Sequence, residues 1–108
     1  MRDKKRNGYV KMSPTDFFAF KVSLKSLPYE VQTTLDLIRA GVILPYRKDG
    51  SIFKNKEKVL PVKASDYYKE YTVPTPEITT RGDRRLVIGK GGEVYYTRDH
   101  YNSFQEIV

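Results

Sequence analysis

The clearest periodic pattern in the chain lies between Pro28 and Gly41. Apolar Val31, Leu35 and Ile38 recur at intervals of four and three residues, which places them on one face of an α-helix. Pro28 suits the first helical position, and Gly41 supplies a C-terminal stop. A single amphipathic helix of this kind needs a sheet to cover its apolar face.

The rest of the chain is rich in short segments typical of β-strands. They cover residues 17–24, 52–53, 66–73, 84–88, 93–97 and 104–108, and the first of them is expected to supply core contacts. The glycine-rich stretch at 89–92 predicts a hairpin turn, because it lacks phosphate-loop spacing and leads into a strand. The pattern predicts an α+β fold with one N-terminal helix packed on a multi-stranded antiparallel β-sheet.

The alternation within two strands separates the core from the charged residues. Leu86 points to one face of its strand and Arg85 to the other, so that Arg85 is expected on an open face if Leu86 covers the helix. Glu70 lies on the face opposite that of Tyr71 and Val73, which are left for the core. Both charges are therefore predicted on a solvent-facing side of the sheet.

Length and composition limit the class of protein. With 108 residues the chain is predicted to be one domain, residues 17–108, after a polar and basic leader or linker at residues 1–16. The start lacks the apolar region of a secretory signal. No apolar run approaches the roughly 20 residues that span a bilayer, so no membrane association is expected.

The charge balance favours an anionic partner. Twenty Lys and Arg residues against thirteen Asp and Glu residues give a net charge of +7. The electrostatic field of this charge attracts polyanions, with nucleic acid as the first candidate and an acidic protein as the second. The alternative that the chain is basic only for solubility remains open. The absence of cysteine excludes thiolate zinc sites, and one histidine excludes a histidine-cluster metal site. No metal or cofactor is expected.

One stretch, residues 67–101, holds four residues that fit phosphate chemistry. Glu70 and His100 can move protons, and Arg81 and Arg85 can hold a phosphate through paired hydrogen bonds. Each alone has a plainer interpretation, as an exposed strand glutamate, a surface histidine or a solvated arginine cluster. Their combination points to RNA cleavage, with a non-catalytic RNA-binding module as the alternative.

Other residues suit the recognition of a base. Tyr46, Phe53 and Tyr101 lie in loop-like surroundings beside charged residues, where an aromatic ring can stack on a base. Glu57 can accept two hydrogen bonds side by side, which matches the donors on the Watson–Crick edge of guanine. Only unpaired RNA exposes that edge.

At these residues the chain resembles the small microbial guanyl-specific ribonucleases, the barnase family, and most of all its RNase Sa branch. The similarity runs from about Val22 onward through LPYEVQTTLDLIRAG, LPYRKDGSIFKNKEKVLP, YYKEYTVPTPEITTRGDRR and YYTRDHYNSFQEI. The resemblance implies cleavage after guanosine, without metal, by transesterification to a 2′,3′-cyclic phosphate and subsequent hydrolysis.

The resemblance also implies a role for each site residue. Glu70 corresponds to the general base for the ribose 2′-hydroxyl and His100 to the general acid for the departing 5′-oxygen. Arg81 and Arg85 correspond to the pair that binds the scissile phosphate, with the Tyr101 hydroxyl beside it. Guanine recognition and the surrounding contacts fall to Glu57, Phe53, Lys54, Asn55, Lys56 and Tyr46.

The expected partner is single-stranded RNA, bound by a monomer. A basic ribonuclease of this kind is expected to be secreted or delivered out of the producing cell, and to act there as a toxin. The producing cell would then need an inhibitor, and an acidic barstar-like protein would complement the basic cleft.

Overall fold

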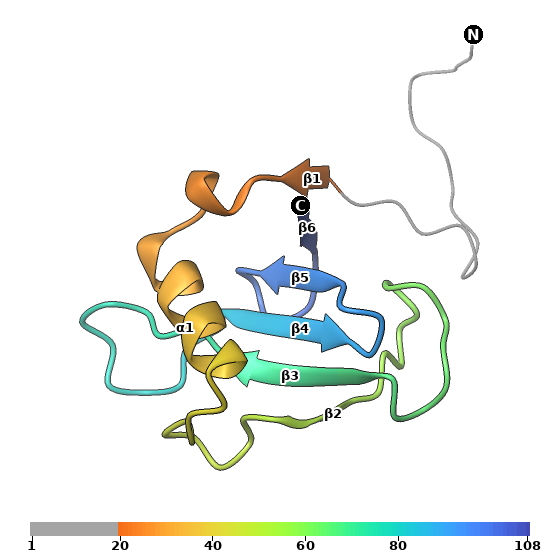
Figure 1. The fold of residues 1–108 in the computed structure, drawn as a ribbon, viewed down its shortest axis with the longest axis horizontal. Helices are drawn as coiled ribbons and strands as arrows, with labels where there is room; N and C mark the ends of the chain where they lie inside the picture. Colours follow the sequence, from red (N-terminus) through yellow and green to blue (C-terminus); the bar gives the residue numbers. More distant parts are fainter. Residues whose placement is uncertain (1–19) are drawn as a thin grey trace, which may run out of the picture.

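The computed structural model describes residues 20–108, in which one α-helix packs on a six-stranded sheet (Figure 1). The predicted leader at residues 1–16 lies outside the described residues. No helix within residues 20–108 is long and apolar enough to cross a membrane. The elements in chain order are β1 (Phe20–Val22), the 3₁₀ turn η1 (Leu24–Ser26), α1 (Tyr29–Arg39), β2 (Ser51–Phe53), β3 (Tyr68–Thr72), β4 (Arg85–Gly89), β5 (Val94–Thr97) and β6 (Gln105–Ile107).

The sheet confirms the predicted α+β architecture. Its strand order is β1-β6-β5-β4-β3-β2, and every pairing is antiparallel except that of β1 with β6, which is parallel. The glycine stretch forms the expected hairpin between β4 and β5, where Gly92 has φ +94° and its amide donates to the Gly89 carbonyl at 3.0 Å. Positive φ favours glycine at this position.

The helix begins one residue later than predicted, because Pro28 is its N-cap and Tyr29 its first residue. It ends as predicted, with Gly41 in the left-handed region at φ +73°. The Gly41 amide donates to the Ile38 carbonyl and the Val42 amide to the Leu37 carbonyl, which together form a Schellman motif.

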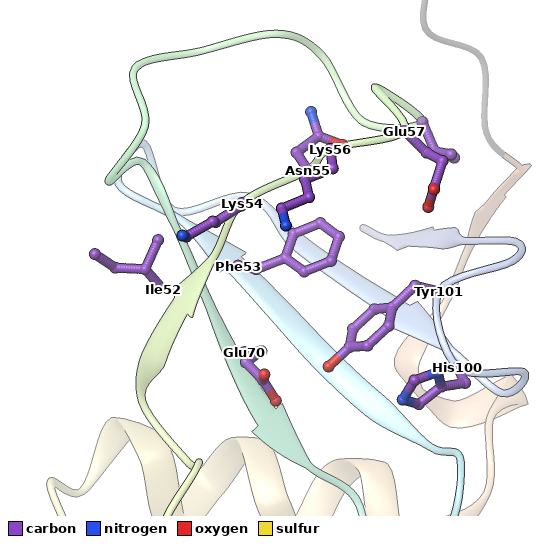
Figure 2. Close-up of a pocket in the computed structure, with 10 residues that line it drawn as sticks. Ile52, Phe53, Lys54, Asn55, Lys56, Glu57, Glu70, His100 and Tyr101 are labelled. Carbon is purple, nitrogen blue, oxygen red and sulfur yellow. The ribbon is translucent and has the colours of Figure 1, made fainter.

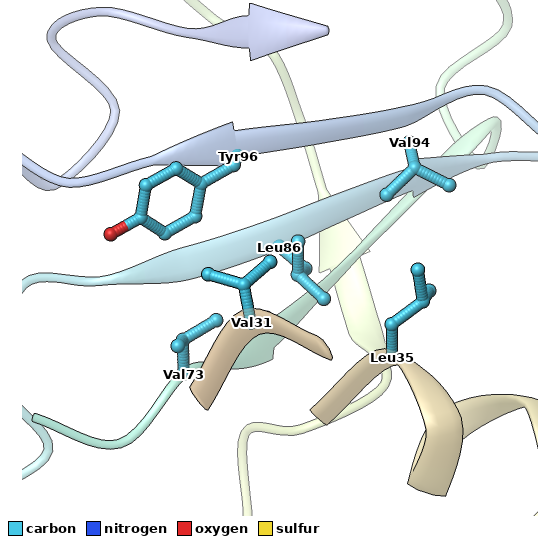
Figure 3. Close-up of a cluster of buried hydrophobic side chains, with 6 residues drawn as sticks. All are labelled: Val31, Leu35, Val73, Leu86, Val94 and Tyr96. Atoms are coloured by element: carbon cyan, nitrogen blue, oxygen red, sulfur yellow. The ribbon is translucent and has the colours of Figure 1, made fainter. Parts of the chain in front are cut away.

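The helix covers one face of the sheet. Val31 and Leu35 are buried against side chains from β4, β5 and the segment after β3, and Ile38 packs against the same cluster. Figure 3 shows the helical residues pointing toward the strands. The cluster consists of Val31, Leu35, Val73, Leu86, Val94 and Tyr96.

The opposite face is not the open surface that the alternation predicted. Arg85 does lie opposite Leu86, but its side chain is only 3% exposed. A second buried cluster covers this face because loop residues fold over the strands, a contact that strand alternation does not reveal. Its members are Leu60, Tyr68, Val87, Tyr95 and Phe104. Glu70 and Arg85 are therefore set into a packed face.

The edge strand β1 contributes less to the core than expected. Phe20 is 71% exposed and Lys21 is exposed, while Val22 is half-buried. The apolar contacts come instead from Leu24 and Leu27, which pack against the helix-side cluster. The predicted strand also included residues 17–19, which lie outside the described residues.

Candidate active site

A carboxylate and two guanidiniums meet at the middle of the sheet. Glu70 lies on β3, where it pairs with Ser51 of β2 and Val87 of β4. Its Oε1 accepts a short hydrogen bond from the Arg81 terminal nitrogen Nη2 and lies 3.8 Å from Nε of Arg85. The Glu70 side chain is 12% exposed, so it is not the freely solvated strand glutamate of the plainer interpretation.

Arg81 is held in place by two further residues. Its Nε donates to the Thr72 hydroxyl at 2.6 Å, and its Nη2 lies 3.9 Å from Oδ1 of Asp49. Asp49 is itself fixed, because Oδ1 accepts the Thr72 amide at 2.7 Å and Oδ2 accepts the Tyr46 amide at 3.2 Å. The guanidinium therefore reaches Glu70 from the loop between β3 and β4 in one defined orientation.

The Arg85 guanidinium is held by two backbone carbonyls. One terminal nitrogen, Nη1, donates to the carbonyls of Gly82 at 2.9 Å and Arg84 at 2.8 Å. Its Nε is buried and has no hydrogen-bond partner within residues 20–108. Arg84 belongs elsewhere, since it points toward the helix and pairs with Glu30 at 3.4 Å. Of the arginines at 81, 84 and 85, two converge on Glu70.

His100 and Tyr101 occupy the loop between β5 and β6 in left-handed backbone conformations, with φ +54° and +74°. Such conformations are unfavourable for residues other than glycine and need outside support. The Thr97 hydroxyl accepts the Tyr101 amide at 3.0 Å, and the Asp83 carbonyl accepts the His100 amide at 3.0 Å. The His100 side chain is exposed beside the Tyr101 ring.

Asp99 ties this loop together. Its Oδ1 accepts the Thr97 hydroxyl and the Ser103 amide, each at 2.9 Å, and its Oδ2 accepts the Ser103 hydroxyl at 2.6 Å. Partial burial alone would raise the pKa of the Asp99 carboxyl, but the hydrogen bonds from Ser103 and Thr97 prevail and lower it. The side chain is ionised at neutral pH and braces the turn that presents His100.

Tyr101 fills the centre of the site. Its ring stacks on Phe53 with centroids 4.8 Å apart, and the Arg85 guanidinium carbon lies 6.0 Å from its centroid. Burial, and then the charge of Glu70, raise the pKa of Tyr101 to about 12. The hydroxyl therefore keeps its proton at neutral pH, and within the described chain it has no hydrogen-bond partner.

The loop after β2 carries the expected base-recognition residues. Asn55 takes a left-handed conformation with φ +54°, and its side chain exchanges two hydrogen bonds with the backbone of Leu60, at 2.9 and 3.1 Å. The Asn55 side chain thus shapes the loop. Lys54, Lys56 and Glu57 are exposed on it.

These parts surround one pocket of about 330 Å³ (Figure 2). Its lining residues include the expected Glu70, His100, Tyr101, Glu57, Phe53, Lys54, Asn55 and Lys56, together with Ile52 and Val59. Arg81 and Arg85 do not line the pocket, but both lie against Glu70, which does. Tyr46 is not in the lining, and its hydroxyl donates to the Thr80 carbonyl at 3.4 Å. Residues 20–108 contain no group of three or more His, Cys, Asp or Glu side chains that could hold a metal ion.

A family model for ribonucleases matches residues 13–108. This chain belongs to the ribonuclease family. The ribonuclease fold predicted from the sequence is thereby confirmed, because a solved structure of ribonuclease Sa2 with mononucleotides superposes with a TM-score of 0.83 at 45% identity, covering 86% of this chain and 97% of that one.

Curated ribonucleases show the same relationship at the level of sequence. Guanyl-specific ribonuclease St from Saccharopolyspora erythraea is 51% identical over 85 residues, which cover 79% of this chain and 84% of that protein. Guanyl-specific ribonuclease Sa from Kitasatospora aureofaciens is 48% identical over 87 residues, covering 80% and 91%. A structure of ribonuclease Sa2 with guanosine-2′-cyclophosphate, 46% identical, superposes with a TM-score of 0.78 and covers 82% of this chain and 96% of that one.

Four supporting residues of this ribonuclease site were not found from the sequence. Asp49 and Thr72 are ordinary polar residues in the sequence, and their local pattern does not indicate that they contact Arg81. Thr97 and Asp99 stand just before His100, and a short polar side chain at each position is the one clue to a hydrogen-bonded turn.

Proposed function

We propose that this protein is a metal-independent endoribonuclease that cleaves single-stranded RNA after guanosine through a 2′,3′-cyclic phosphate. The observation that carries the proposal is the pocket shared by Glu70 and His100, in which the carboxylate also contacts two guanidiniums. A base and an acid on either side of an anion-binding pair are the parts that phosphoryl transfer from an internal nucleophile needs.

The proposed reaction has two steps. Glu70 accepts the proton of the ribose 2′-hydroxyl, the 2′-oxygen attacks the phosphorus, and the bond from phosphorus to the 5′-oxygen breaks as His100 donates a proton to that oxygen. Arg81 and Arg85 stabilise the charge that develops on the phosphoryl oxygens. In the second step the roles reverse, and water opens the cyclic phosphate. The attacking group belongs to the substrate, so the protein supplies proton transfer, charge and positioning.

Guanine preference is assigned to Glu57, whose exposed carboxylate lines the same pocket. It would accept hydrogen bonds from N1–H and the N2 amino group, with the base stacked in the aromatic surroundings of Phe53 and Tyr101. The guanyl-specific relatives and the ribonuclease Sa2 structure with guanosine-2′-cyclophosphate support this preference. DNA lacks the 2′-hydroxyl and should not be cleaved.

The test uses four dinucleoside phosphates that differ in the 5′ base, in excess EDTA. The wild type should cleave the guanosine substrate. His100→Asn, chosen because asparagine tolerates the left-handed backbone, should reduce kcat by about 10²- to 10⁴-fold. Glu57→Gln should reduce the preference for guanosine. A folded wild type that binds RNA but cleaves none of the substrates would overturn the proposal in favour of an RNA-binding module.

Action outside the producing cell as a toxin is the biological part of the proposal. A net charge of +7 suits an acidic barstar-like inhibitor that covers the site by charge complementarity. Expression of the wild type without such a protein should stop growth, while expression of the His100→Asn variant should not. Equal growth of cells that express the wild type and cells that express His100→Asn would contradict toxicity.

A further inference from the structure

A second cavity of about 270 Å³ lies along the same loop as the base pocket. Phe53, Lys54, Asn55 and Lys56 line both cavities, so the loop separates two hollows. The remaining lining of the second cavity comes from the segment that follows the loop and from β3. These residues are Lys58, Val62, Lys63, Ala64, Ser65 and Tyr68.

Four lysines surround this cavity, namely Lys54, Lys56, Lys58 and Lys63. All four are exposed, and none of their ammonium groups forms an ion pair with another residue of the 20–108 region. Lys63 also acts on the carboxylate of Glu93, whose pKa its charge helps to lower, whereas the carboxylate of Asp66 is paired with Lys90 at 2.9 Å. Four cations that share one hollow raise the local positive potential.

The base of this cavity is rigid. Tyr68 is buried, its hydroxyl donates to the Pro61 carbonyl at 2.6 Å, and its ring meets that of Phe53 edge to face at 6.5 Å. The loop backbone that carries Lys54, Lys56 and Lys58 is fixed by the hydrogen bonds between Asn55 and Leu60. The Nζ atom of Lys63 lies 5.3 Å from the centroid of the Tyr67 ring. The floor of the cavity and the loop backbone are therefore fixed before an anion binds, and the exposed lysine side chains adjust to it.

We propose that this lysine cavity binds a backbone phosphate of the RNA strand beyond the dinucleotide that is cleaved. The inference rests on the proposed function, because it takes the base pocket as the place where guanosine enters. Lys54 and Lys56 line both cavities, so a strand whose guanosine fills the first can continue along the loop into the second. The phosphate belongs to a nucleotide on the 5′ or the 3′ side of the cleaved bond, and the experiment distinguishes the two.

The test compares the double variant Lys58→Gln/Lys63→Gln with the wild type on three substrates. These are a guanosine dinucleoside phosphate, and two oligonucleotides with a single guanosine that are extended only on the 5′ or only on the 3′ side. Lys58 and Lys63 line the second cavity but not the base pocket. We expect unchanged kcat/KM for the dinucleotide and about a 5- to 20-fold loss for one extended substrate.

The salt dependence gives an independent readout. On a single strand, each phosphate that the variant no longer neutralises should reduce the slope of log kcat/KM against log salt by about 0.7. The matched control is Lys21→Gln/Lys25→Gln, which removes the same charge near β1, at the opposite edge of the sheet from β2. The control should change the extended substrate less than the test variant does.

The outcomes separate the two proposals. If the wild type cleaves the dinucleotide but both double variants behave alike on all substrates, the lysine cavity is not an RNA site. If the wild type cleaves nothing, the proposed function fails, and the cavity is then tested by the anisotropy of a labelled oligonucleotide with 2′-deoxyguanosine. Binding weakened by Lys58→Gln/Lys63→Gln, and not by the control, would still support the inference, and equal binding would overturn it.

Discussion

The Nε atom of Arg85 lies 3.8 Å from Oε1 of Glu70, in a buried position where it has no hydrogen-bond partner within residues 20–108. This separation is too long for a hydrogen bond, although the opposite charges attract. An unsatisfied buried donor of this kind destabilises a fold by about 1–3 kcal/mol. The hydrogen bonding of the Arg85 guanidinium is therefore incomplete within the described residues, although its charge lies next to that of Glu70.

This relationship predicts that a nucleotide stabilises the fold through Arg85. Guanosine 3′-monophosphate at 100 times its Kd should raise the free energy of unfolding by about 2.7 kcal/mol, because it binds only the folded chain. Arg85→Lys keeps the positive charge but loses the planar guanidinium with its several N–H donors. The rise in Tm of this variant at the same nucleotide concentration should therefore be much smaller than that of the wild type. Differential scanning fluorimetry with and without the nucleotide measures both.

The neighbouring arginine supplies the control. Arg84 points to Glu30 on the helix side of the sheet, so Arg84→Lys should keep the full rise in Tm. Equal rises in Arg85→Lys and the wild type would show that Arg85 does not contact the phosphate.

Tyr101 should show a trade-off between stability and activity. Its buried hydroxyl has no partner in the described chain, and removing such a group relieves an unfavourable desolvation. Tyr101→Phe should therefore leave the free energy of unfolding unchanged or raise it by up to about 1 kcal/mol, while kcat for the guanosine substrate falls by about 10-fold. Urea unfolding and steady-state kinetics measure the two effects. A loss of stability without a loss of kcat would show that the hydroxyl serves the fold.

Buried tyrosines also predict a fall in stability at alkaline pH. Burial is the first cause that raises the pKa of Tyr95 and of Tyr101, each to about 12, and it also raises that of Tyr68. In the unfolded chain tyrosine ionises near pH 10, so between about pH 10 and 12 the folded state holds more protons than the unfolded state. Stability therefore falls as pH rises through this range and is unaffected near pH 7.

Urea midpoints at pH 8, 9.5 and 11 would measure this fall. The double variant Tyr95→Phe/Tyr101→Phe should show a smaller decrease than the wild type. Tyr29→Phe changes an exposed ring and serves as the control. A midpoint in the wild type that stays constant up to pH 11 would contradict the prediction.

The strand pattern predicted the sheet well because alternation is a local property. Leu86 and Arg85 lie on opposite faces, as expected, and Glu70 shares its face with Arg85. What alternation could not predict is how far that face is covered. Leu60 and Phe104 reach it from distant loops, and only their packing in three dimensions turns an apparently open face into a second core.

The residues of the candidate site also fall into two groups, those that the sequence reveals and those that it does not. Residues with distinctive chemistry, such as Glu57 and His100, could be selected from the sequence and share one pocket in the structure. Asp49 and Thr72 could not, because they act through contacts across the fold: Asp49 binds an amide 23 positions away and Thr72 orients an arginine 9 positions away. Ordinary polar residues reveal such roles only when the contacts are known.

Asp99 is predicted to be a positioning residue for His100. It does not line the pocket, yet it holds the turn in which His100 and Tyr101 adopt left-handed conformations. Asp99→Ala removes the acceptor of three hydrogen bonds, so it should lower the free energy of unfolding by about 1–3 kcal/mol. Arg98→Ala, an exposed change in the same loop, is the control for general effects of substitution there.

The kinetic signature distinguishes positioning from a purely structural role. A displaced His100 should reduce kcat for the guanosine dinucleotide by about 10- to 100-fold with little change in KM, because proton donation depends on geometry more than ground-state binding does. Asp99→Asn keeps the oxygen that accepts the Thr97 and Ser103 hydrogen bonds and should recover much of the lost kcat. If Asp99→Ala lowers stability but keeps the kcat of the wild type at a temperature where it is fully folded, the turn does not set the position of His100.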